Sequence, residues 1–333
     1  VFCSPAATNA RSDYMDGGDG DDRIWADLTT DTVIGGAGTN EIIPLNNIDP
    51  SGCLTVSVGG IDADDVPISH TIVFEFVGTD TARLTVDGTN HDFPRELVTC
   101  FDAETEGGND TIRVDASVTV PTTLVGGLGD DTLQGGSAAD SIDGGDGDDS
   151  ILGNDGNDTL VGGNGNNYLD GGNGNDSILG GPGDDTLVDG MGDDTVDGGG
   201  GDDVYFQSPG SDDVLRDSGG SDTVSFLRAA RAVRFDLSNN AGQRQVVDAN
   251  RNTVALNGLF ENLIGSRFAD DLVGDAGPNR IDGGGGDDSL DGGGGDRTPF
   301  GGTATSTDRR AGAGCDGDTL IGGAGHDWLD GGR

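Results

Sequence analysis

From Gly126 to Phe206 the chain reads as nine consecutive nonapeptides: GGLGDDTLQ, GGSAADSID, GGDGDDSIL, GNDGNDTLV, GGNGNNYLD, GGNGNDSIL, GGPGDDTLV, DGMGDDTVD and GGGGDDVYF. Each unit starts with a glycine-rich stretch, carries Asp or Asn at position six and has a large apolar residue at position eight. A fixed short period of this kind predicts a stacked repeat architecture rather than one globular core. The stretch therefore decides the fold class.

The last three positions of each unit predict a short strand with one inward side chain. Side chains alternate between the two faces of a strand, so position eight points opposite to positions seven and nine. We expect position eight to form a narrow apolar column, with positions seven and nine facing water. The column would consist of Leu133, Ile142, Ile151, Leu160, Leu169, Ile178, Leu187, Val196 and Tyr205.

The first six positions predict a tight loop that binds a hard cation. Glycine tolerates positive φ and close backbone approach, so carbonyl oxygens of such a loop can converge on one point. The aspartate at position six adds a charged oxygen. Carboxylate and carbonyl oxygens are the ligands of Ca²⁺, whereas the Cys and His ligands that Zn²⁺ prefers are missing from these units. The ion predicted is calcium. A flexible Gly/Asp linker is the alternative, but it has no reason to keep an apolar residue at every ninth position.

These nonapeptides resemble the calcium-binding repeats of the RTX, or haemolysin-type, family. The resemblance implies an all-β fold, a parallel β-roll in which two nonapeptides form one turn and each ion lies between two stacked loops. Position-six aspartates would serve one edge through Asp131, Asp149, Asp185 and Asp203, and the other through Asp140, Asp158, Asp176 and Asp194. Asn167 replaces the expected aspartate in one unit, and Ala138 replaces the third glycine in another, which puts the adjoining sites in doubt.

Weaker copies of the repeat extend the prediction toward both termini. The segment FENLIGSRFADDLVGD (260–275) closely resembles the one that re-enters the β-roll in secreted RTX proteins, including serralysin-type proteases. The further candidate ligands are Asp22, Asp212, Asp270, Asp288, Asp318 and Asp327. On the order of ten Ca²⁺ are then expected, one for each stacked pair of loops.

Interruptions of the period divide the chain into five regions. Residues 1–43 hold degenerate repeats, 44–125 form a strand-rich insert or capping coil, and 126–225 are the main calcium β-roll. Residues 226–264 are an irregular insert with five arginines, and 265–333 are a C-terminal roll with a loop at 298–312. The arginines are expected to neutralise neighbouring aspartate rows or, alternatively, to contact the acidic roll of another molecule.

Composition excludes several classes of partner. The net charge is −44, which argues against nucleic acid and anionic membranes because both need a basic face. No stretch approaches the roughly twenty apolar residues of a membrane span. Four cysteines predict structural disulfides or free thiols, with Cys53 and Cys100 as the preferred pair because they flank one insert.

Catalytic motifs are missing from the sequence. It has three histidines, no H-E-x-x-H, no G-x-S-x-G and no P-loop, so we expect no enzymatic activity from these residues. The first functional hypothesis is an extracellular structural protein at a bacterial cell surface, in a layer, matrix, filament or adhesin. The second is a non-catalytic module of a secreted protease or polysaccharide epimerase. Self-association and surface polysaccharide are the partners considered beside calcium.

Overall fold

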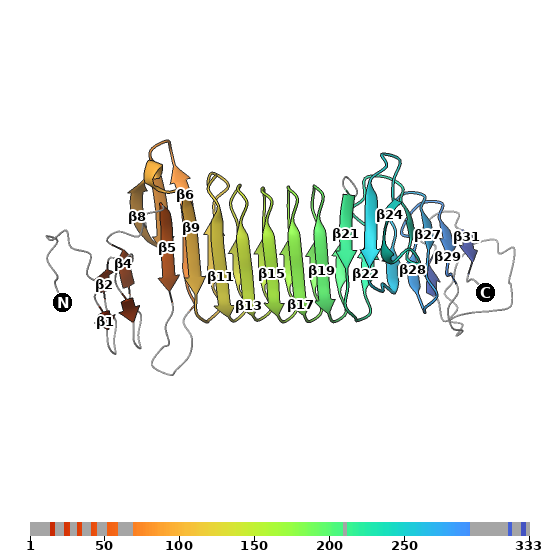
Figure 1. Ribbon diagram of the computed structural model, residues 1–333, viewed down its shortest axis with the longest axis horizontal. Coiled ribbons are helices and arrows are strands. Elements are labelled where there is room, and N and C mark those ends of the chain that lie inside the picture. The colour runs from red at the N-terminus through yellow and green to blue at the C-terminus, as the bar shows by residue number, and fades with distance from the viewer. Residues whose placement is uncertain are drawn as a thin grey trace.

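The computed structural model describes residues 52–58, 69–208 and 212–293, and the backbone of short strands nearer the two termini. The strands lie side by side along the long axis of the molecule and form a β-solenoid (Figure 1). Almost all neighbouring strands pair in parallel, with antiparallel pairing confined to two hairpin regions. The predicted parallel β-roll is confirmed.

Successive strands of the main array alternate between two large sheets, because each half-coil crosses from one sheet to the other. The first sheet contains, in spatial order, β30 (Thr319–Ile321), β28 (Arg280–Asp282), β26 (Asn262–Ile264), β22 (Thr223–Ser225), β20 (Val204–Phe206), β18 (Thr186–Val188), β16 (Tyr168–Asp170), β14 (Ser150–Leu152), β12 (Thr132–Gln134), β10 (Thr111–Val114), β6 (Thr71–Val77), β7 (Thr81–Val86) and β8 (Thr89–Pro94). The second contains β24 (Ala241–Val246), β25 (Thr253–Asn257), β21 (Asp212–Arg216), β19 (Thr195–Gly200), β17 (Ser177–Pro182), β15 (Thr159–Asn164), β13 (Ser141–Asp146), β11 (Thr122–Leu128), β9 (Cys100–Thr105) and β5 (Cys53–Val58).

Smaller sheets complete the two ends. β23 (Arg234–Asp236), β27 (Asp271–Val273), β29 (Ser289–Asp291) and β31 (Trp328–Asp330) form one sheet beyond the second large sheet. Near the N-terminus, β1 (Tyr14–Asp16) pairs with β3 (Thr32–Ile34), and β2 (Arg23–Ala26) pairs with β4 (Glu41–Pro44), all in parallel. A single turn of 3-10 helix, η1 (Arg95–Leu97), is the one helical element in the described residues.

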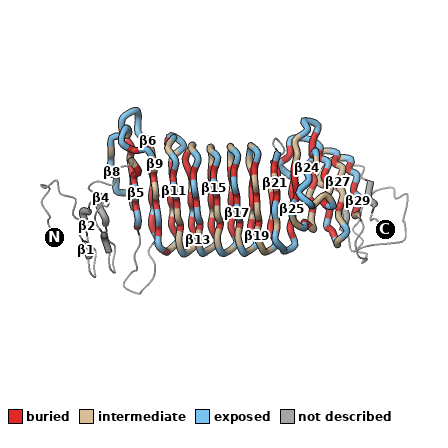
Figure 2. The backbone as a smooth tube through the Cα atoms, viewed as in Figure 1, coloured by how far each residue is buried: buried red, intermediate tan, exposed pale blue. Residues whose placement is uncertain are grey.

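The apolar column is confirmed. Partners along the ladder are two nonapeptides apart, as in Ile151 beside Leu169 and Leu160 beside Ile178. Every position-eight residue of the main array is at most 1% exposed, so the core is one side chain wide in each half-coil. Figure 2 shows the resulting alternation of buried and exposed segments along each coil. Tyr205 is accommodated because its hydroxyl accepts the Gly198 N–H and donates to the Arg216 carbonyl.

Position nine departs from the prediction at one place. Leu179 is 42% exposed, as expected, whereas Val188 is only 2% exposed. Its neighbour on β20 is Phe206, and the guanidinium of Arg228 lies 5.1 Å from the centre of that ring. Arg228 of the 226–264 segment therefore lies over Phe206 beside the buried Val188.

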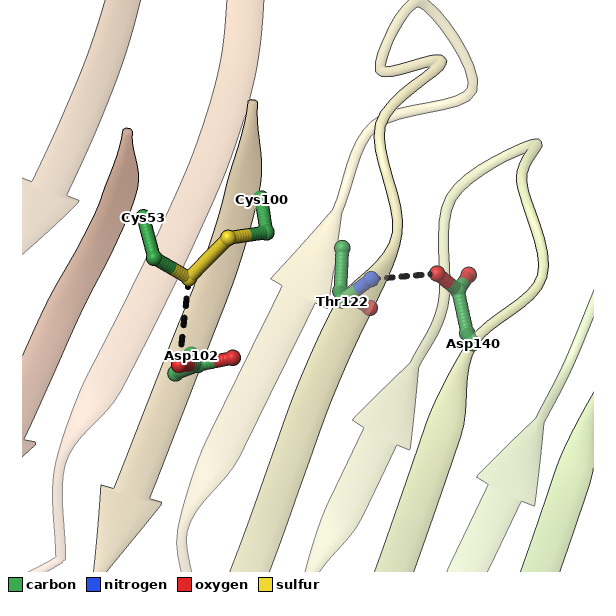
Figure 3. The surroundings of a disulfide bond; sticks show 5 residues. All are labelled: Cys53, Cys100, Asp102, Thr122 and Asp140. Atoms are coloured by element: carbon green, nitrogen blue, oxygen red, sulfur yellow. Dashed lines mark hydrogen bonds between the residues drawn. A yellow bond between two sulfur atoms is a disulfide. The ribbon is translucent and has the colours of Figure 1, made fainter. Parts of the chain in front are cut away.

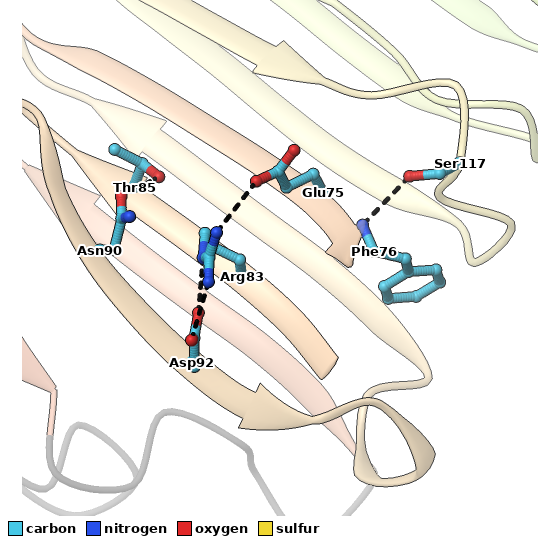
Figure 4. Close-up of polar contacts among 7 residues, drawn as sticks. All are labelled: Glu75, Phe76, Arg83, Thr85, Asn90, Asp92 and Ser117. Atoms are coloured by element: carbon cyan, nitrogen blue, oxygen red, sulfur yellow. Dashed lines mark hydrogen bonds and ion pairs between the residues drawn. The ribbon is translucent and has the colours of Figure 1, made fainter. Parts of the chain in front are cut away.

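The N-terminal insert is an elaborated part of the solenoid. β5 pairs with β9 and β6 with β10 in parallel, so these strands continue the two large sheets. The β7–β8 hairpin extends the edge, and Arg83 binds Asp92 through two hydrogen bonds of 2.7 and 3.0 Å (Figure 4). A disulfide joins Cys53 to Cys100 on adjacent strands, with the Asp102 carboxylate beside it (Figure 3). The preferred cysteine pair is confirmed; Cys3 and Cys315 lie outside the described residues.

The second insert is less irregular than predicted. Within 226–264, β26 stacks in parallel on β22, so the first large sheet continues through the insert to β28. β25 stacks in parallel on β21, and the second large sheet ends there with the β24–β25 hairpin. The excursion is the β24–β25 hairpin together with β23, which starts the new sheet through β27. Arg231 and Arg234 pair with Asp248 and Asp271 rather than with the position-six rows. The predicted loop at 298–312 lies outside the described residues.

Candidate metal centres

The position-six residues line up in two rows, one on each edge of the solenoid, which we call the inner rows. The first inner row contains Asp110, Asp131, Asp149, Asn167, Asp185, Asp203 and Asp222. The second contains Asp140, Asp158, Asp176, Asp194 and Asp213. Each row lies where the loops of one edge stack, so the repeat period itself brings the side chains together.

One oxygen of each inner-row side chain is fixed by the backbone. From the second member of each row onward, Oδ1 accepts a hydrogen bond from the N–H of the preceding member, at 2.7–3.0 Å. In the first members, Asp110 and Asp140, the donors are the N–H groups of His70 and Thr122. Oδ2 is different. It is buried and has no hydrogen-bond partner in Asp110, Asp131, Asp149, Asp158, Asp176, Asp185, Asp194, Asp203 and Asp222. An unpartnered buried oxygen costs roughly 1–3 kcal/mol, and buried charges are normally paired or bound to metal.

The first glycine of the repeat forms a cradle beside these oxygens. A Cβ added at Gly153 would lie 2.5 Å from Asp158 Oδ2 and 2.5 Å from the Gly171 carbonyl oxygen. At Gly171 the corresponding distances, to Asp176 Oδ2 and the Asp189 carbonyl oxygen, are 2.5 and 2.6 Å. A carboxylate oxygen and a carbonyl oxygen from stacked loops thus converge on one place, and glycine leaves that place open.

The pKa values of the inner-row carboxylates reflect their burial and their closeness to one another. Burial raises the pKa of Asp131 and Asp158 to about 7. The N–H bonded to Oδ1 opposes this rise, and the like charge of neighbouring carboxylates adds to it. The pKa of Asp194 rises to about 8 for the same reasons, with Asp189 and Asp213 as the neighbouring charges. A row of such carboxylates therefore takes up either protons or a cation near neutral pH.

In three other loops, the oxygen equivalent to Oδ2 accepts a hydrogen bond from an N–H of the same loop. Asp140 Oδ2 accepts the Gly136 N–H at 2.7 Å, Asp270 Oδ2 accepts the Ser266 N–H, and Asn279 Oδ1 accepts the Asp275 N–H at 2.8 Å. In each case the donor is position two of the same loop. We call these three, which start at Gly135, Gly265 and Gly274, the closed loops.

In the remaining loops of residues 126–203, position two has positive φ, and these we call the open loops. Gly145, Gly163 and Gly181 have φ of 107°, 94° and 122°, and Asn154 reaches 75°. Every open loop has Gly or Asn at position two and Gly at position four, whereas each closed loop lacks one of these. Ala138 is such a departure, so the sequence signal that made this loop doubtful coincides with a changed hydrogen bond.

Two further departures are explained by geometry. Asn167 keeps its place in the first inner row, but its Nδ2 donates to the Gly165 carbonyl where an aspartate would present Oδ2. An amide N–H₂ cannot ligate a cation, so the doubt about this unit is physically justified. Asp212, a predicted ligand, does not occupy the row: one coil is nineteen residues long, and the buried row member is Asp213. The position assigned to Asp212 was therefore off by one residue.

Asp212 belongs instead to an outer row that the sequence analysis missed. Position-five residues on both edges also stack, and there the N–H of each residue donates to the Oδ1 of the preceding one. The first outer row contains Asn109, Asp130, Asp148, Asn166, Asp184, Asp202 and Ser221. The second contains Asn157, Asn175, Asp193, Asp212 and Thr253. The recurrence of Asp and Asn at position five was the available signal.

Other predicted ligands are placed as follows. Asp288 is buried and accepts the Asp270 N–H at 2.8 Å, so these two form a short row beyond the second insert. Asp110 and Asp222 belong to the first inner row although they were not among the predicted ligands. Asp22, Asp318 and Asp327 lie outside the described residues.

The residues present fit a hard divalent cation. Each open loop except the one with Asn167 supplies a buried carboxylate oxygen without a protein partner, and the facing loop supplies a carbonyl oxygen beside it. The open-loop sites of residues 126–203 present carboxylate and carbonyl oxygens, and His70 lies at the N-terminal end of the first inner row, where its N–H donates to Asp110 Oδ1. An all-oxygen donor set of this kind suits Ca²⁺. When bound, the ion would neutralise carboxylates of neighbouring coils.

Comparison with known proteins agrees with this chemistry. The family model described as the RTX calcium-binding nonapeptide repeat matches residues 8–42, 122–151, 152–187, 170–205, 264–299 and 316–333, together just over half of the chain. The comparison with curated proteins found no match. Several copies of one family repeat on a continuous solenoid establish the relationship. The chain belongs to the RTX calcium-binding nonapeptide repeat family.

Proposed function

We propose that this protein is a calcium-dependent extracellular scaffold, a rigid rod that serves in a bacterial surface layer, matrix, filament or adhesin. The observation that carries the proposal is the set of buried Oδ2 atoms without a partner in the open loops. Each leaves a penalty of roughly 1–3 kcal/mol in the ion-free chain, so the solenoid gains most of its order where Ca²⁺ is abundant. Such concentrations are typical of the extracellular space.

One feature supports the extracellular setting. Cys53 and Cys100 form a disulfide, which persists in oxidising compartments. In the part of the chain that the structure describes, no helix is long and apolar enough to span a bilayer.

A non-catalytic role is part of the proposal. Most carboxylates whose pKa is strongly raised, such as Asp131, Asp158 and Asp194, belong to the repeating inner rows. Their environment recurs from coil to coil, as a structural metal row requires, whereas a catalytic pair needs two different environments. The secreted-enzyme module remains the competing hypothesis, favoured by the resemblance of residues 260–275 to the re-entry segment of serralysin-type proteins.

The decisive experiment measures folding and assembly together. Circular dichroism of the full chain should lose most of its β-signal in excess chelator and regain it on addition of Ca²⁺, whereas equal Mg²⁺ should restore much less, because Mg²⁺ demands a tighter octahedral site. Electron microscopy of the Ca²⁺-loaded chain should show rods, fibres or sheets. A spectrum unaffected by chelator contradicts the calcium scaffold. Monodisperse single particles, together with a catalytic domain encoded beside this chain, would support the enzyme module instead.

A further inference from the structure

Two units carry an aspartate where the repeat has its first glycine. Asp189 begins one unit on the second edge, and Asp217 begins another on the first edge. Both lie at the C-terminal end of the main array. The separation along the inner rows changes there from eighteen residues, between Asp176 and Asp194, to nineteen, between Asp194 and Asp213. These aspartates thus mark the junction between the regular array and the second insert.

The first cluster consists of Asp189, Asp194 and Asp213. Each side chain offers an oxygen within 4.8 Å of the others, and all three residues are 1% exposed. Asp194 Oδ2 is buried without a hydrogen-bond partner. Asp189 is held rigidly, since Oδ1 accepts the Gly190 N–H at 2.6 Å and both oxygens accept the Ser208 N–H at 3.0 and 3.1 Å.

The second cluster repeats this arrangement on the opposite edge. Asp203, Asp217 and Asp222 offer oxygens within 4.8 Å of one another. Asp203 and Asp222 are fully buried, and the Oδ2 atom of each has no hydrogen-bond partner. The Oδ1 atom of Asp217 is also buried without a partner. Tyr205 lies beside this cluster, since a Cβ built at Gly198 would touch both its hydroxyl and Asp203 Oδ2.

Position one is the place from which a side chain enters the ion site. At Gly171, the Cβ direction leads to the position-six Oδ2 of the same loop and a carbonyl oxygen of the facing loop. An aspartate at this position sends a third carboxylate into the same space. Affinity of oxygen sites for Ca²⁺ rises with the number of charged ligands and with the rigidity of the site.

We propose that Asp189 and Asp217 turn these two sites into three-carboxylate Ca²⁺ sites, which bind the ion more tightly than the regular sites and fill first. The two ions fix both edges of the solenoid at the junction where the coil length changes. This inference rests on the proposed calcium-dependent scaffold and adds an order of filling to it.

The test is calorimetric titration of the full, Ca²⁺-depleted chain with CaCl₂, combined with equilibrium dialysis to count bound ions. Asp189→Gly and Asp217→Gly restore glycine at position one of their units, and Asp143→Gly, an exposed position-nine change, is the control. The wild type should show a tight class of two sites ahead of the others. Each glycine variant should convert one tight site into a site that binds Ca²⁺ at least tenfold more weakly. The total number of bound ions should stay unchanged. The control should leave both classes intact.

Terbium provides a second readout that reports location. Tyrosine-sensitised Tb³⁺ emission should appear with the first equivalents added, and Tyr205→Phe should reduce that early emission more than Tyr168→Phe does. If either glycine variant binds one ion more than the wild type, the aspartate occupies the ion's place and the inference is overturned. A single class of sites, unchanged in the variants, also overturns it while leaving the scaffold proposal intact. Absence of any Ca²⁺ binding by the wild type would overturn both.

Discussion

Open and closed loops occupy equivalent positions in the solenoid and both bury the side chain at position six. They differ in whether its second oxygen has a hydrogen-bond partner. In the open loop that ends at Asp176, Oδ2 has no protein partner and faces a neighbouring carbonyl oxygen. In the closed loop that ends at Asp140, the equivalent oxygen accepts the Gly136 N–H. Positive φ at position two accompanies the open state, so the direction of one peptide decides whether a carboxylate needs a cation. We therefore expect position-six aspartates to bind Ca²⁺ in open loops and not in closed loops.

The largest expected difference is between Asp176→Ala and Asp140→Ala. Both residues are 3% exposed in the second inner row, and both accept a backbone N–H from the preceding coil. Asp176→Ala should lower the Ca²⁺ count by about one or two ions, because the carboxylate borders two coils. It also forfeits a linkage stabilisation of about 2.7 kcal/mol per lost ion at free Ca²⁺ of a hundred times Kd.

Asp140→Ala should leave the Ca²⁺ count unchanged and cost roughly 1–3 kcal/mol through its lost hydrogen bonds. Equilibrium dialysis and chemical denaturation in saturating Ca²⁺ measure the two effects. Equal ion loss in both variants would show that the closed loop binds calcium after all.

The next contrast concerns position two itself. Gly145 has φ of 107°, and an added Cβ would overlap the Gly127 carbonyl, so Gly145→Ala should destabilise the loaded chain by roughly 2–4 kcal/mol through strain and displaced backbone. Gly136 lacks positive φ, and its Cβ would lie 3.0 Å from the Val118 carbonyl oxygen, so Gly136→Ala should cost about 1 kcal/mol or less. Urea unfolding measures the free energy lost in each variant. A larger loss in Gly136→Ala than in Gly145→Ala would contradict the assignment of open and closed loops.

pH should act mainly on the open loops. The pKa of Asp149, Asp158 and Asp194 is raised to about 6, 7 and 8. The folded ion-free chain therefore binds more protons than the unfolded chain between about pH 4 and 8, and its stability falls as pH rises through that window. Ca²⁺ affinity should rise over the same window, because binding releases those protons.

Unfolding in chelator across pH, with a parallel Ca²⁺ titration, tests both directions. In the closed loop at Asp140 the Gly136 N–H opposes the rise in pKa, so removing that carboxylate should change the pH profile less than removing Asp158. An ion-free chain that becomes more stable from pH 4 to 8 would contradict the buried environment of the inner rows.

The smallest effect is expected from opening a closed loop. Ala138→Gly gives the unit GGSGAD, with glycine at positions two and four as in every open loop except the one with Asn154. We expect one additional Ca²⁺, bound weakly, and little change in stability in saturating Ca²⁺. Exposed Asp143→Ala serves as the control for dialysis counts. An unchanged count would mean that contacts beyond these two positions hold the loop closed.

Much of this molecule follows from the sequence alone, because a strict period leaves few arrangements. Strand alternation within the nine-residue repeat predicted the apolar column from Leu133 to Tyr205. The resemblance of the repeat to RTX sequences implied the parallel β-roll and the stacking of position six. Prediction from the period was wrong where a coil has nineteen residues instead of eighteen. One added residue moved the row from Asp212 to Asp213, and only strand pairing reveals that shift.

Tertiary structure alone decided three matters. It showed that position-two N–H groups close some loops, that the second insert returns to both sheets, and that Asp189 and Asp217 meet the inner rows at the junction. The physical reason is that a sequence period specifies which side chains stack, whereas the direction of individual peptides and the path of inserts depend on contacts between coils. Those contacts determine which aspartates keep an oxygen free for calcium.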